Sequence, residues 1–370
     1  MKVLTVFGTR PEAIKMAPLV RLLEADEAFR SVLCVTAQHR EMLDGVLELF
    51  GLRPDYDLNI MQPNQSIGAI TANVLAGLED VIAREAPDVM LVHGDTTTTF
   101  AAALAGFYKM CKIGHVEAGL RTHDRYSPYP EEMNRVLTSR LADFHFAPTR
   151  RNRDELLREG VDESGIFVTG NTVIDALLEV SRRPYSFTEG PLATMDFENR
   201  RLITVTCHRR ENLGENMTAV FSAVRDIAEA FEDVEVVYPV HLNPRVRAAA
   251  DAVLGGAARV HLMAPLGYLP FVKLMAASHL IITDSGGMQE EAPSLGKPVL
   301  VVRKETERPE AVEAGTVRLA GVRREEIFAH AAELLTERAA YERMARAVNP
   351  YGDGHASRRI VDILKAQGIQ

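Results

Sequence analysis

The sequence lacks several features that would assign it to a class at once. It contains no tryptophan, only three cysteines among 370 residues, and no apolar run near the roughly 18 residues that a membrane span requires. The cysteines, Cys34, Cys111 and Cys207, are odd in number and share no metal-type spacing, which indicates a reducing compartment. The apolar stretch at the N-terminus is too short for a secretory signal. We therefore expect a cytoplasmic protein without a membrane partner.

Motifs for common cofactors are also missing. The loop after the first apolar run has no GxGxxG pattern, and neither a Walker loop nor HExxH occurs. Tyr108 and Lys112 form a YxxxK pair without the glycine fingerprint that accompanies it in short-chain dehydrogenases. His115-x-Glu117 has no PCxxC to complete a zinc deaminase site. We expect neither a metal ion nor a nicotinamide or ATP cofactor.

Net charge narrows the ligand class further. The formal charge of −9 argues against a general nucleic-acid or lipid-surface binder. An anionic ligand would need a local basic patch, for which Arg10, Lys15, Arg135 and the run His208-Arg209-Arg210 are the candidates.

Short β-branched runs alternate with amphipathic helical patterns along the whole chain. This alternation predicts parallel sheets covered by helices on both faces. The expected strands are Val3 to Phe7, Ser31 to Ala37, Asp88 to His93, Lys112 to Glu117, Phe144 to Pro148, Leu202 to Thr206, Val234 to Val240, Arg259 to Met263, Leu280 to Thr283 and Pro298 to Val302.

The alternation breaks between Arg182 and Arg200, where Pro184, Gly190 and Pro191 interrupt any periodicity. Such a stretch is typical of an interdomain linker. We expect an α/β protein of two Rossmann-like, doubly wound domains facing a cleft, one over residues 1–182 and one over residues 183–350. Ligands of these sheets bind beyond the carboxyl ends of the strands.

GTRPEAIK (Gly8 to Lys15) directly follows the first expected strand. Gly8 permits a tight turn, Pro11 suits the first helical position, and Thr9 or Arg10 lies near the cap. Arg10 and Lys15 would then project toward the cleft. The alternative is a surface ion pair between Glu12 and Lys15, three positions apart.

Three acids follow strand ends in the first half of the chain. Asp95 ends one strand, Glu117 ends the next, and Glu131 begins a helix that also carries Arg135. Asp95 could instead be a helix N-cap, and Glu131 a partner of the helix dipole or of Arg135. Glu117 is less easily explained as a cap. Three acids converging on one cleft are better explained by proton transfer than by three separate structural roles.

The stretch from Asp284 to Glu310 is the most informative part of the second half. An apolar strand ends in Asp284-Ser285-Gly286-Gly287, and a helical pattern follows at once. Free N–H groups at such a helix start form an anion site. Glu290 and Glu291 could accept hydrogen bonds from sugar hydroxyls, so the stretch predicts a nucleotide-sugar site.

A second basic cluster ends the first strand of this half. His208, Arg209, Arg210, Glu211 and Asn212 lie together where a leaving phosphate could bind; the alternative is a solvated basic loop. His241 lies at a strand-to-helix turn, as a ligand contact or as a packed polar residue.

The motifs together resemble one family. FGTRPEAIK, QHREML, HGDTTTT, HVEAGLRT, PEEMNR, HRREN, PVHxNP, DSGGMQEE and TERPE, in order from Phe7 to Glu310, are similar to those of the non-hydrolysing UDP-N-acetylglucosamine 2-epimerases. The resemblance implies a glycosyltransferase-B-like fold in which residues 351–370 form a helix packing back on the first domain. Ala37, where the family often has glycine, and Gly267, where it often has aspartate, depart from the pattern.

The resemblance implies interconversion of UDP-N-acetylglucosamine and UDP-N-acetylmannosamine without a cofactor, for cell-wall or capsular polysaccharide synthesis. Because the carbon 2 proton is not beside a carbonyl and no nicotinamide site exists to oxidise carbon 3, we expect UDP to be expelled and returned through a 2-acetamidoglucal. Asp95 and Glu117 would transfer protons, Glu131, Arg135 and Lys15 would support them, and His208 would assist the leaving UDP. Expected substrate contacts are Arg10, Ser285, Gly286, Gly287, Glu291, Asn212, His241 and Arg308.

The family also implies a homodimer and an activating UDP-N-acetylglucosamine site at Gln38, His39, Arg40 and Arg210. Three other functions remain open at this point: a UDP-dependent glycosyltransferase, a hydrolysing epimerase and a UDP-sugar sensor without activity. The first needs an acceptor site, and the hydrolysing epimerases usually carry a kinase domain that this chain lacks. The acidic trio argues against the sensor.

Overall fold

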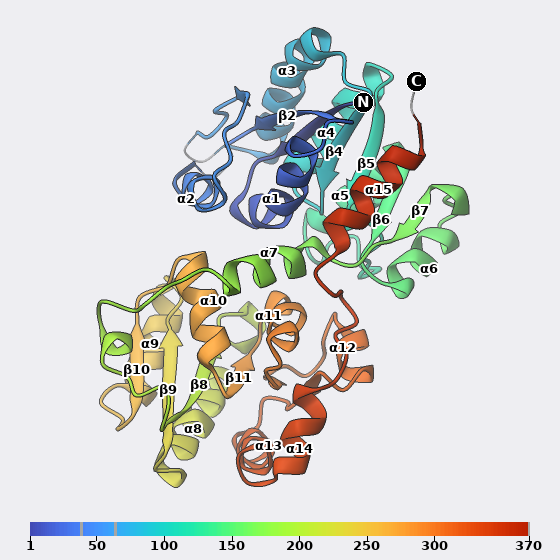
Figure 1. Ribbon diagram of the computed structural model, residues 1–370. Helices are drawn as coiled ribbons and strands as arrows, with labels where there is room; N and C mark the ends of the chain where they lie inside the picture. The colour runs from blue at the N-terminus through green and yellow to red at the C-terminus, as the bar shows by residue number, and fades with distance from the viewer. Residues whose placement is uncertain (38–39, 63–64, 369–370) are drawn as a thin grey trace. The chain divides into compact units, whose positions relative to one another are not determined.

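The computed structural model describes residues 1–37, 40–62 and 65–368, and the chain forms two compact units (Figure 1). Unit 1 comprises Met1–Ala176 and Tyr351–Gln370, and unit 2 comprises Leu177–Pro350. Unit 1 therefore closes within helix α7 (Thr172–Ser181), a little before the expected boundary at residue 182. Among the described residues, no helix combines the length and apolar character needed to cross a membrane.

Unit 1 contains a parallel sheet in the order β3-β2-β1-β4-β5-β6-β7. Its strands are β1 (Lys2–Phe7), β2 (Arg30–Val35), β3 (Tyr56–Asp57), β4 (Val89–His93), β5 (Lys112–Val116), β6 (Phe144–Ala147) and β7 (Ile166–Val168). Its helices, besides α7, are α1 (Arg10–Glu24), α2 (Arg40–Phe50), α3 (Ile67–Glu85), α4 (Thr97–Tyr108), α5 (Glu131–Leu141), α6 (Arg150–Arg158), the short η1 (Glu163–Gly165) and the C-terminal α15 (Ala356–Ala366).

Unit 2 repeats this design with a parallel sheet in the order β10-β9-β8-β11-β12-β13. Its strands are β8 (Arg201–Thr206), β9 (Val234–Pro239), β10 (Val260–Met263), β11 (Leu280–Thr283), β12 (Val299–Val301) and β13 (Val317–Leu319). Its helices are α8 (Glu215–Ala230), α9 (Pro244–Leu254), α10 (Tyr268–Ala277), α11 (Gly286–Glu291), α12 (Pro309–Glu313), α13 (Arg324–Thr336), α14 (Arg338–Ala345) and the short η2 (Pro191–Ala193), η3 (Arg210–Asn212) and η4 (Ala292–Leu295).

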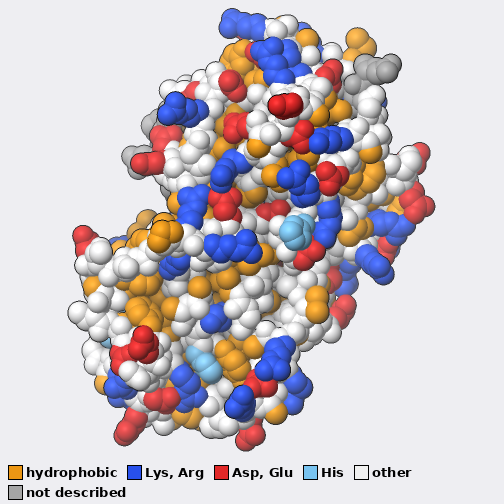
Figure 2. All heavy atoms as spheres, viewed as in Figure 1, with side chains coloured by type: hydrophobic (Ala, Val, Ile, Leu, Met, Phe, Trp, Pro, Cys, Tyr) orange, Lys and Arg blue, Asp and Glu red, His pale blue; other side chains and the backbone are white. Residues whose placement is uncertain are grey.

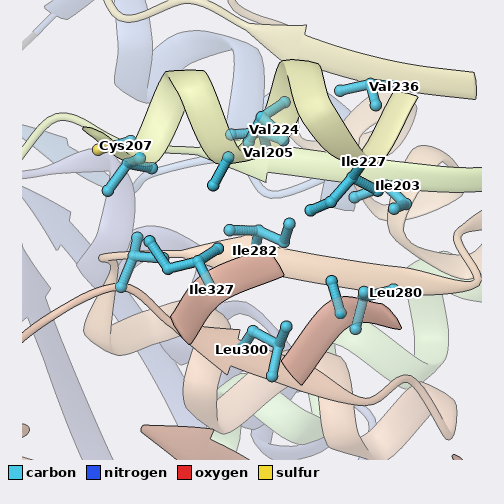
Figure 3. Close-up of a cluster of buried hydrophobic side chains, with 14 of the residues drawn as sticks. Ile203, Val205, Cys207, Val224, Ile227, Val236, Leu280, Ile282, Leu300 and Ile327 are labelled. Atoms are coloured by element: carbon cyan, nitrogen blue, oxygen red, sulfur yellow. The ribbon is translucent and has the colours of Figure 1, made fainter. Parts of the chain in front are cut away.

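Both faces of the unit 2 sheet are buried, as alternation along its strands requires. Ile203 and Val205 of β8 pack with Val224 and Ile227 of α8 in a cluster that β11, β12 and α13 complete (Figure 3). Leu202, directly before Ile203 in β8, faces a second cluster containing Leu274 of α10. Leu202 and Leu274 are fully or almost fully buried.

Leu192, in the stretch that we expected to be an interdomain linker, is also buried in that second cluster. Phe187, Met195 and Phe197 pack beside it, and Phe187 stacks on Phe197 with ring centroids 5.7 Å apart. The stretch between residues 182 and 200 therefore belongs to the fold of unit 2, although it contains only one short helix, η2.

Strand order determines where ligands can bind. In unit 1 the order reverses at β1, which pairs with β2 on one side and β4 on the other. In unit 2 it reverses at β8, between β9 and β11. Doubly wound sheets bind ligands beyond the carboxyl ends of the strands at such reversals. The turns after β1 and β4, and those after β8 and β11, carry most of the predicted site residues.

The surface carries charges of both signs. Figure 2 shows Lys and Arg side chains interspersed with Asp and Glu over the visible face. The net charge of −9 is therefore compatible with local basic clusters of the kind that an anionic ligand requires.

Candidate active site

Glu12 joins the two turns at the strand reversal of unit 1. One oxygen of its buried carboxylate accepts hydrogen bonds from the Gly8 and Thr9 backbone N–H groups at 3.1 and 2.8 Å. The other accepts from the hydroxyls of Thr96 and Thr99 at 2.7 and 3.1 Å. Because Glu12 is fully used in this way, the alternative of a surface ion pair between Glu12 and Lys15 is wrong.

Lys15 instead reaches Glu117, whose carboxylate is the centre of the polar cluster in unit 1. The Lys15 ammonium donates to Glu117 Oε2 at 2.5 Å, and Asn171 Nδ2 donates to the same oxygen at 2.9 Å. His93 Nε2 lies 3.7 Å from it, on a ring that is almost fully buried. Sequence reasoning missed both His93 and Asn171.

These contacts set the protonation state of Glu117. Burial by itself raises the pKa of this carboxyl, but the positive charge of Lys15, the nearby His93 ring and the hydrogen bond from Lys15 hold the pKa well below its usual range. Glu117 is therefore ionised at neutral pH. A carboxylate in this state can accept a proton but is a poor donor.

The backbone of Glu117 is also unusual, because its φ is +63°. A non-glycine residue in this left-handed region carries about 1–3 kcal/mol of strain, and such residues cluster at functional sites.

Buried His115, two residues before Glu117, hydrogen-bonds to the Gly94 carbonyl through Nε2 at 2.7 Å, and burial lowers the pKa of His115 to about 3. Neutral His115 thus helps fix the backbone that precedes Asp95.

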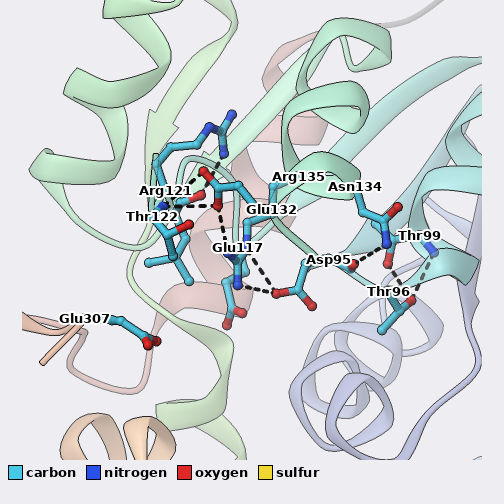
Figure 4. A network of polar contacts seen from close by, with 12 residues as sticks. Asp95, Thr96, Thr99, Glu117, Arg121, Thr122, Glu132, Asn134, Arg135 and Glu307 are labelled. Carbon is cyan, nitrogen blue, oxygen red and sulfur yellow. Dashed lines mark hydrogen bonds and ion pairs between the residues drawn. The ribbon is translucent and has the colours of Figure 1, made fainter. Parts of the chain in front are cut away.

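Asp95 is held by the guanidinium of Arg135 (Figure 4). Arg135 Nη2 and Nε donate to Asp95 Oδ2 at 2.6 and 3.0 Å, and its Nη1 donates to Glu132 at 3.0 Å. The N-cap of α4 is Thr96, whose hydroxyl accepts from the Thr99 N–H at 3.1 Å. The alternative in which Asp95 is a plain N-cap is therefore wrong.

Glu132 has the structural role that the sequence suggested for its neighbour Glu131. Besides Arg135, it accepts hydrogen bonds from the N–H groups of Thr122 and His123 at 3.0–3.1 Å. Oε2 of Glu131 is buried, and no described residue hydrogen-bonds to it. The alternative in which Glu131 pairs with Arg135 is wrong, because Arg135 is directed to Asp95 and Glu132.

In both Asp95 and Glu117, one carboxylate oxygen accepts side-chain hydrogen bonds from the described part of the chain and the other does not. Among the described residues, the side-chain hydrogen bonds to these two carboxylates reach Asp95 Oδ2 and Glu117 Oε2, and none reaches Asp95 Oδ1 or Glu117 Oε1. Oε1 of Glu117 faces Gly94, where an added Cβ would lie 3.8 Å away. The arrangement fixes both carboxylates and leaves the second oxygen of each without a hydrogen bond from a described residue.

In unit 2, Asp284 organises the site, although the motif that contains it did not indicate a role for it. Its fully buried Oδ2 accepts from the backbone N–H groups of His208 and Arg209 at 2.9 and 2.8 Å and from Asn212 Nδ2 at 3.0 Å. Asn212 also donates to the Val302 carbonyl at 3.0 Å. Asn212 is therefore a support of the loop after β8, although we predicted it to contact substrate.

His208 and His241 stack on each other with centroids 5.0 Å apart and an interplanar angle of 12°. Burial lowers the pKa of His208; Asp284 opposes this effect, and His241 and Arg209 reinforce it. His208 Nδ1 lies 3.8 Å from Asp284 Oδ1. His208 and His241, which the sequence indicated separately, thus form one stacked pair, and His241 is the exposed ring of that pair.

Ser285 is the N-cap of α11, and its side chain makes no capping bond. A Cβ at Gly286 would lie 3.6 Å from Arg209 Nη2 and 3.7 Å from Arg308 Nη2, so two guanidiniums flank this turn. Arg308 is oriented by an ion pair with Glu290. Oε1 of Glu291, at the last residue of α11, lies 3.3 Å from the same kind of added Cβ at Gly287. Two guanidiniums and the Glu291 carboxylate therefore lie next to this turn.

Buried Arg303 forms an ion pair with Glu211 at 2.6 Å near this turn.

The remaining predicted residues are exposed or lie outside the described residues. Arg10 and Arg210 are exposed. Gln38 and His39 lie outside the described residues, as does the side chain of Arg40, at the start of α2. In the ranges that are described, no group of three or more His, Cys, Asp or Glu side chains is arranged to hold a metal ion.

Comparisons with known proteins give a consistent result. The family model described as UDP-N-acetylglucosamine 2-epimerase matches residues 21–365. A protein of Thermotoga maritima named as a putative UDP-N-acetylglucosamine 2-epimerase is 58% identical over 98% of this chain and 96% of its own length.

Solved structures agree. A putative UDP-N-acetylglucosamine 2-epimerase from Listeria monocytogenes superposes with a TM-score of 0.93 at 52% identity, over 99% of this chain and 96% of that one. The UDP-GlcNAc 2-epimerase of Neisseria meningitidis, solved bound to UDP-GlcNAc, gives 0.88 at 50% identity over 99% of this chain and all of that one.

The predicted fold class, a glycosyltransferase-B-like pair of Rossmann-like sheets, is confirmed by the two parallel sheets and by these structures. The family predicted from the motifs is confirmed as well. With relatives that are more than half identical along almost the entire chain, this protein belongs to the UDP-N-acetylglucosamine 2-epimerase family of enzymes.

Proposed function

We propose that the protein interconverts UDP-N-acetylglucosamine and UDP-N-acetylmannosamine by eliminating UDP and adding it back. In the first step a carboxylate removes the carbon 2 proton, the C–H electron pair forms a double bond between carbons 1 and 2, and UDP leaves with the electrons of the C1–O bond. The products are 2-acetamidoglucal and UDP. In the second step carbon 2 is protonated from the opposite face and UDP attacks carbon 1, which gives the epimer.

The observation that supports this proposal most strongly is the state of the two acids in unit 1. Asp95 and Glu117 are each anchored through one oxygen and carry no described hydrogen bond on the other. Epimerisation needs one group on each face of carbon 2, because the proton leaves one face and returns to the other. We propose Asp95 and Glu117 for these roles, with Glu131, Arg135 and Lys15 supporting them. Close carboxylates titrate as a coupled set, so the roles are assigned to the pair.

The proposal assigns UDP to unit 2 and proton transfer to unit 1, with the two parts of the chain as the two domains that we expected. The diphosphate would bind the turn Ser285-Gly286-Gly287 with Arg308 beside it, and His208 would assist departure of UDP. Glu291 and His241 would contact the nucleoside part, and Arg10 of unit 1 would add a further cation. Preorganised donors and cations of this kind stabilise charge that develops on a leaving phosphate.

Unit 2 must also retain UDP, because the same UDP is added back. This requirement distinguishes the reaction from glycosyl transfer, in which UDP is released. Asp284 supports retention indirectly, since it fixes the backbone at His208 and Arg209. We further propose a homodimer, a cytoplasmic location and activation by UDP-N-acetylglucosamine at the site expected around Arg40 and Arg210; these predictions rest on the family resemblance.

One experiment tests the function. The protein is incubated with UDP-N-acetylglucosamine alone in deuterated water, and the products are followed by NMR. We expect UDP-N-acetylmannosamine at equilibrium, with deuterium at carbon 2 of both sugars. Free sugar would indicate a hydrolysing epimerase, no reaction without an acceptor would indicate a transferase, and binding without conversion would indicate a sensor.

Amide variants test the assignment of the acids. Asp95→Asn and Glu117→Gln should each lower the exchange rate by about 10²–10⁴-fold while UDP still binds. Glu159→Gln is the matched control: Glu159 is paired with a buried arginine, Arg121, at 2.7 Å and has no role in the proposal. Wild-type exchange rates in both Asp95→Asn and Glu117→Gln would refute the assignment.

A further inference from the structure

Asn171 links Glu117 to the C-terminal segment of unit 1. Its buried side chain donates from Nδ2 to Glu117 Oε2 at 2.9 Å, and its backbone N–H donates to the Tyr351 carbonyl at 2.6 Å. Its Oδ1 accepts from the Val173 N–H at 3.0 Å, next to the start of α7. We infer that Asn171 is a positioning residue for Glu117 in the epimerisation, and that the segment returning from Tyr351 holds it in place. The inference rests on the function proposed above.

Three groups approach Oε2 of Glu117 from three elements, and they differ in how strongly they can orient it. Lys15 reaches it from α1 on a flexible four-carbon chain, which can follow a carboxylate that moves. His93 of β4 lies farther away, at 3.7 Å. Asn171 has a short side chain whose other end is bonded to the Val173 N–H. The amide is therefore the contact that best defines the orientation of the carboxylate, and with it the position of Oε1.

The segment around Asn171 is itself held by the returning chain. Gly170 has φ +89°, and a Cβ there would meet the Tyr351 carbonyl oxygen at 3.4 Å. Asp175, in the first turn of α7, accepts from the N–H groups of Ala356 and Ser357 at 3.2 and 2.8 Å, where α15 begins. Arg359 of α15 donates to the Thr169 carbonyl at 3.0 Å. Hydrogen bonds on both sides of Asn171, at the Thr169 carbonyl and the Asp175 carboxylate, thus join this segment to residues near the C-terminus.

The same returning segment supports the other strong partner of Glu117. Helix α15 packs against α1, the helix that carries Lys15 (Figure 1). Lys365 of α15 also pairs with Asp26, just beyond α1, at 2.5 Å. Lys15 and Asn171, two of the three groups near Glu117 Oε2, therefore belong to segments that contact α15 or the loop before it. The C-terminal helix α15 thus supports unit 1, the unit to which we assign proton transfer.

The decisive variant is Asn171→Asp. Aspartate is as good a helix cap as asparagine and leaves the backbone bond to Tyr351 intact, so the local fold should survive. It removes the donor to Glu117, however, and places a second negative charge beside it. We expect kcat for epimerisation to fall by about 10²-fold with little change in KM. We also expect the acidic limb of the kcat profile to move up by roughly one pH unit, because a like charge favours protonation of Glu117.

The control is Asn199→Asp, which makes the same change at an exposed site. Asn199 Nδ2 donates to Asp196 Oδ2 at 2.8 Å, so this variant also replaces an amide-to-carboxylate bond with a like-charge pair. It should keep wild-type kcat and the wild-type pH profile. If Asn171 has only a structural role, Asn171→Asp will behave like the control, and that result overturns the inference.

The two hypotheses fail in different ways. If the wild-type protein does not exchange the carbon 2 proton, the proposed function is wrong. If the wild type exchanges it and Asn171→Asp does so with the same kcat and pH profile, only the positioning role is wrong. A circular dichroism spectrum and melting temperature for Asn171→Asp close to those of the wild type establish that a lower kcat does not come from unfolding.

Discussion

Lys15 donates to Oε2 of Glu117 at 2.5 Å, across 102 positions of the sequence. This pair keeps the pKa of Glu117 well below its usual value of 4.5, against the effect of burial. In Lys15→Met the strongest opposing charge is gone, so burial raises that pKa. Because the base must be ionised to accept a proton, the acidic limb of the kcat profile should move to higher pH, measured by initial rates from pH 4.5 to 8.

The same pair determines a pH dependence of stability. A carboxyl with a lowered pKa contributes stability above its unfolded pKa, and this contribution is lost as the pH falls through the folded pKa. Lys15→Met should therefore lower the free energy of unfolding at neutral pH by roughly 3 kcal/mol. The difference should shrink as the pH falls from the raised pKa of Glu117 in the variant to its lowered pKa in the wild type. The control is Lys112→Met. Lys112 pairs with Asp143 at 2.7 Å with half of its side chain exposed, so its loss should cost about 0–1 kcal/mol.

Ala86 is the C-cap of α3 in the left-handed conformation, with φ +43°, and its side chain is exposed. Glycine adopts this conformation without steric cost and is the usual residue after a helix. Ala86→Gly should therefore raise the free energy of unfolding by about 0.5–1 kcal/mol. Ala83→Gly, at an exposed position inside the same helix, should lower it by about 1 kcal/mol. Denaturant unfolding of both variants tests the pair, and equal effects of the same sign would contradict it.

The interior of both sheets could be predicted from the sequence. All ten strands that we expected are present, because a strand buried on both faces appears as a short continuous apolar run. The three that we missed, β3, β7 and β13, are edge strands of two or three residues. Edge strands are short and partly exposed, so Tyr56–Asp57 and Val317–Leu319 carry no such run.

The site could be predicted only in part. The rule that ligands bind beyond strand ends indicated Asp95, Glu117 and His208 as candidates, because each lies within two residues of the end of a buried strand. Their partners could not be found in this way. Arg135 pairs with Asp95 and Glu132 rather than with Glu131, and Asn171 reaches Glu117 from beyond β7, a strand that the sequence did not reveal. Asp284 was quoted as part of a motif, but its bonds to the loop after β8 depend on the pairing of β8 with β11.

Asp284 accepts three hydrogen bonds from the loop after β8 while fully buried. All three bonds reach Oδ2, so in Asp284→Asn the amide oxygen can take its place, but the negative charge that strengthens these three hydrogen bonds is lost. We expect the free energy of unfolding to fall by about 1–3 kcal/mol and the affinity for UDP to fall about tenfold or more, as measured by calorimetry.

The matched control is Asp233→Asn. Asp233 pairs with the Arg201 guanidinium at 2.6 Å and is half exposed, so the affinity for UDP should not change. Wild-type affinity in Asp284→Asn would show that the loop after β8 does not contribute to nucleotide binding.

His208 should couple UDP binding to pH. Its pKa is lowered by burial, with His241 and Arg209 adding to the effect and Asp284 opposing it, so the ring is neutral at pH 7 in the free protein. A diphosphate beside it favours the protonated ring and raises that pKa. Binding should then take up a proton, and the affinity for UDP should increase as the pH falls from 7.5 toward 6.

UDP itself titrates in this range, so the evidence is the difference between the wild type and His208→Gln. The variant should bind UDP with a shallower pH dependence and should turn over UDP-N-acetylglucosamine about 10²-fold more slowly. His261→Gln is the control, because His261 pairs with Glu235 at 2.7 Å on strand β10, at the sheet edge. Full activity and an unchanged pH dependence in His208→Gln would show that His208 does not assist the departure of UDP. Arg209 and Arg308, beside the turn at Gly286, would then be the remaining candidates to stabilise the leaving diphosphate.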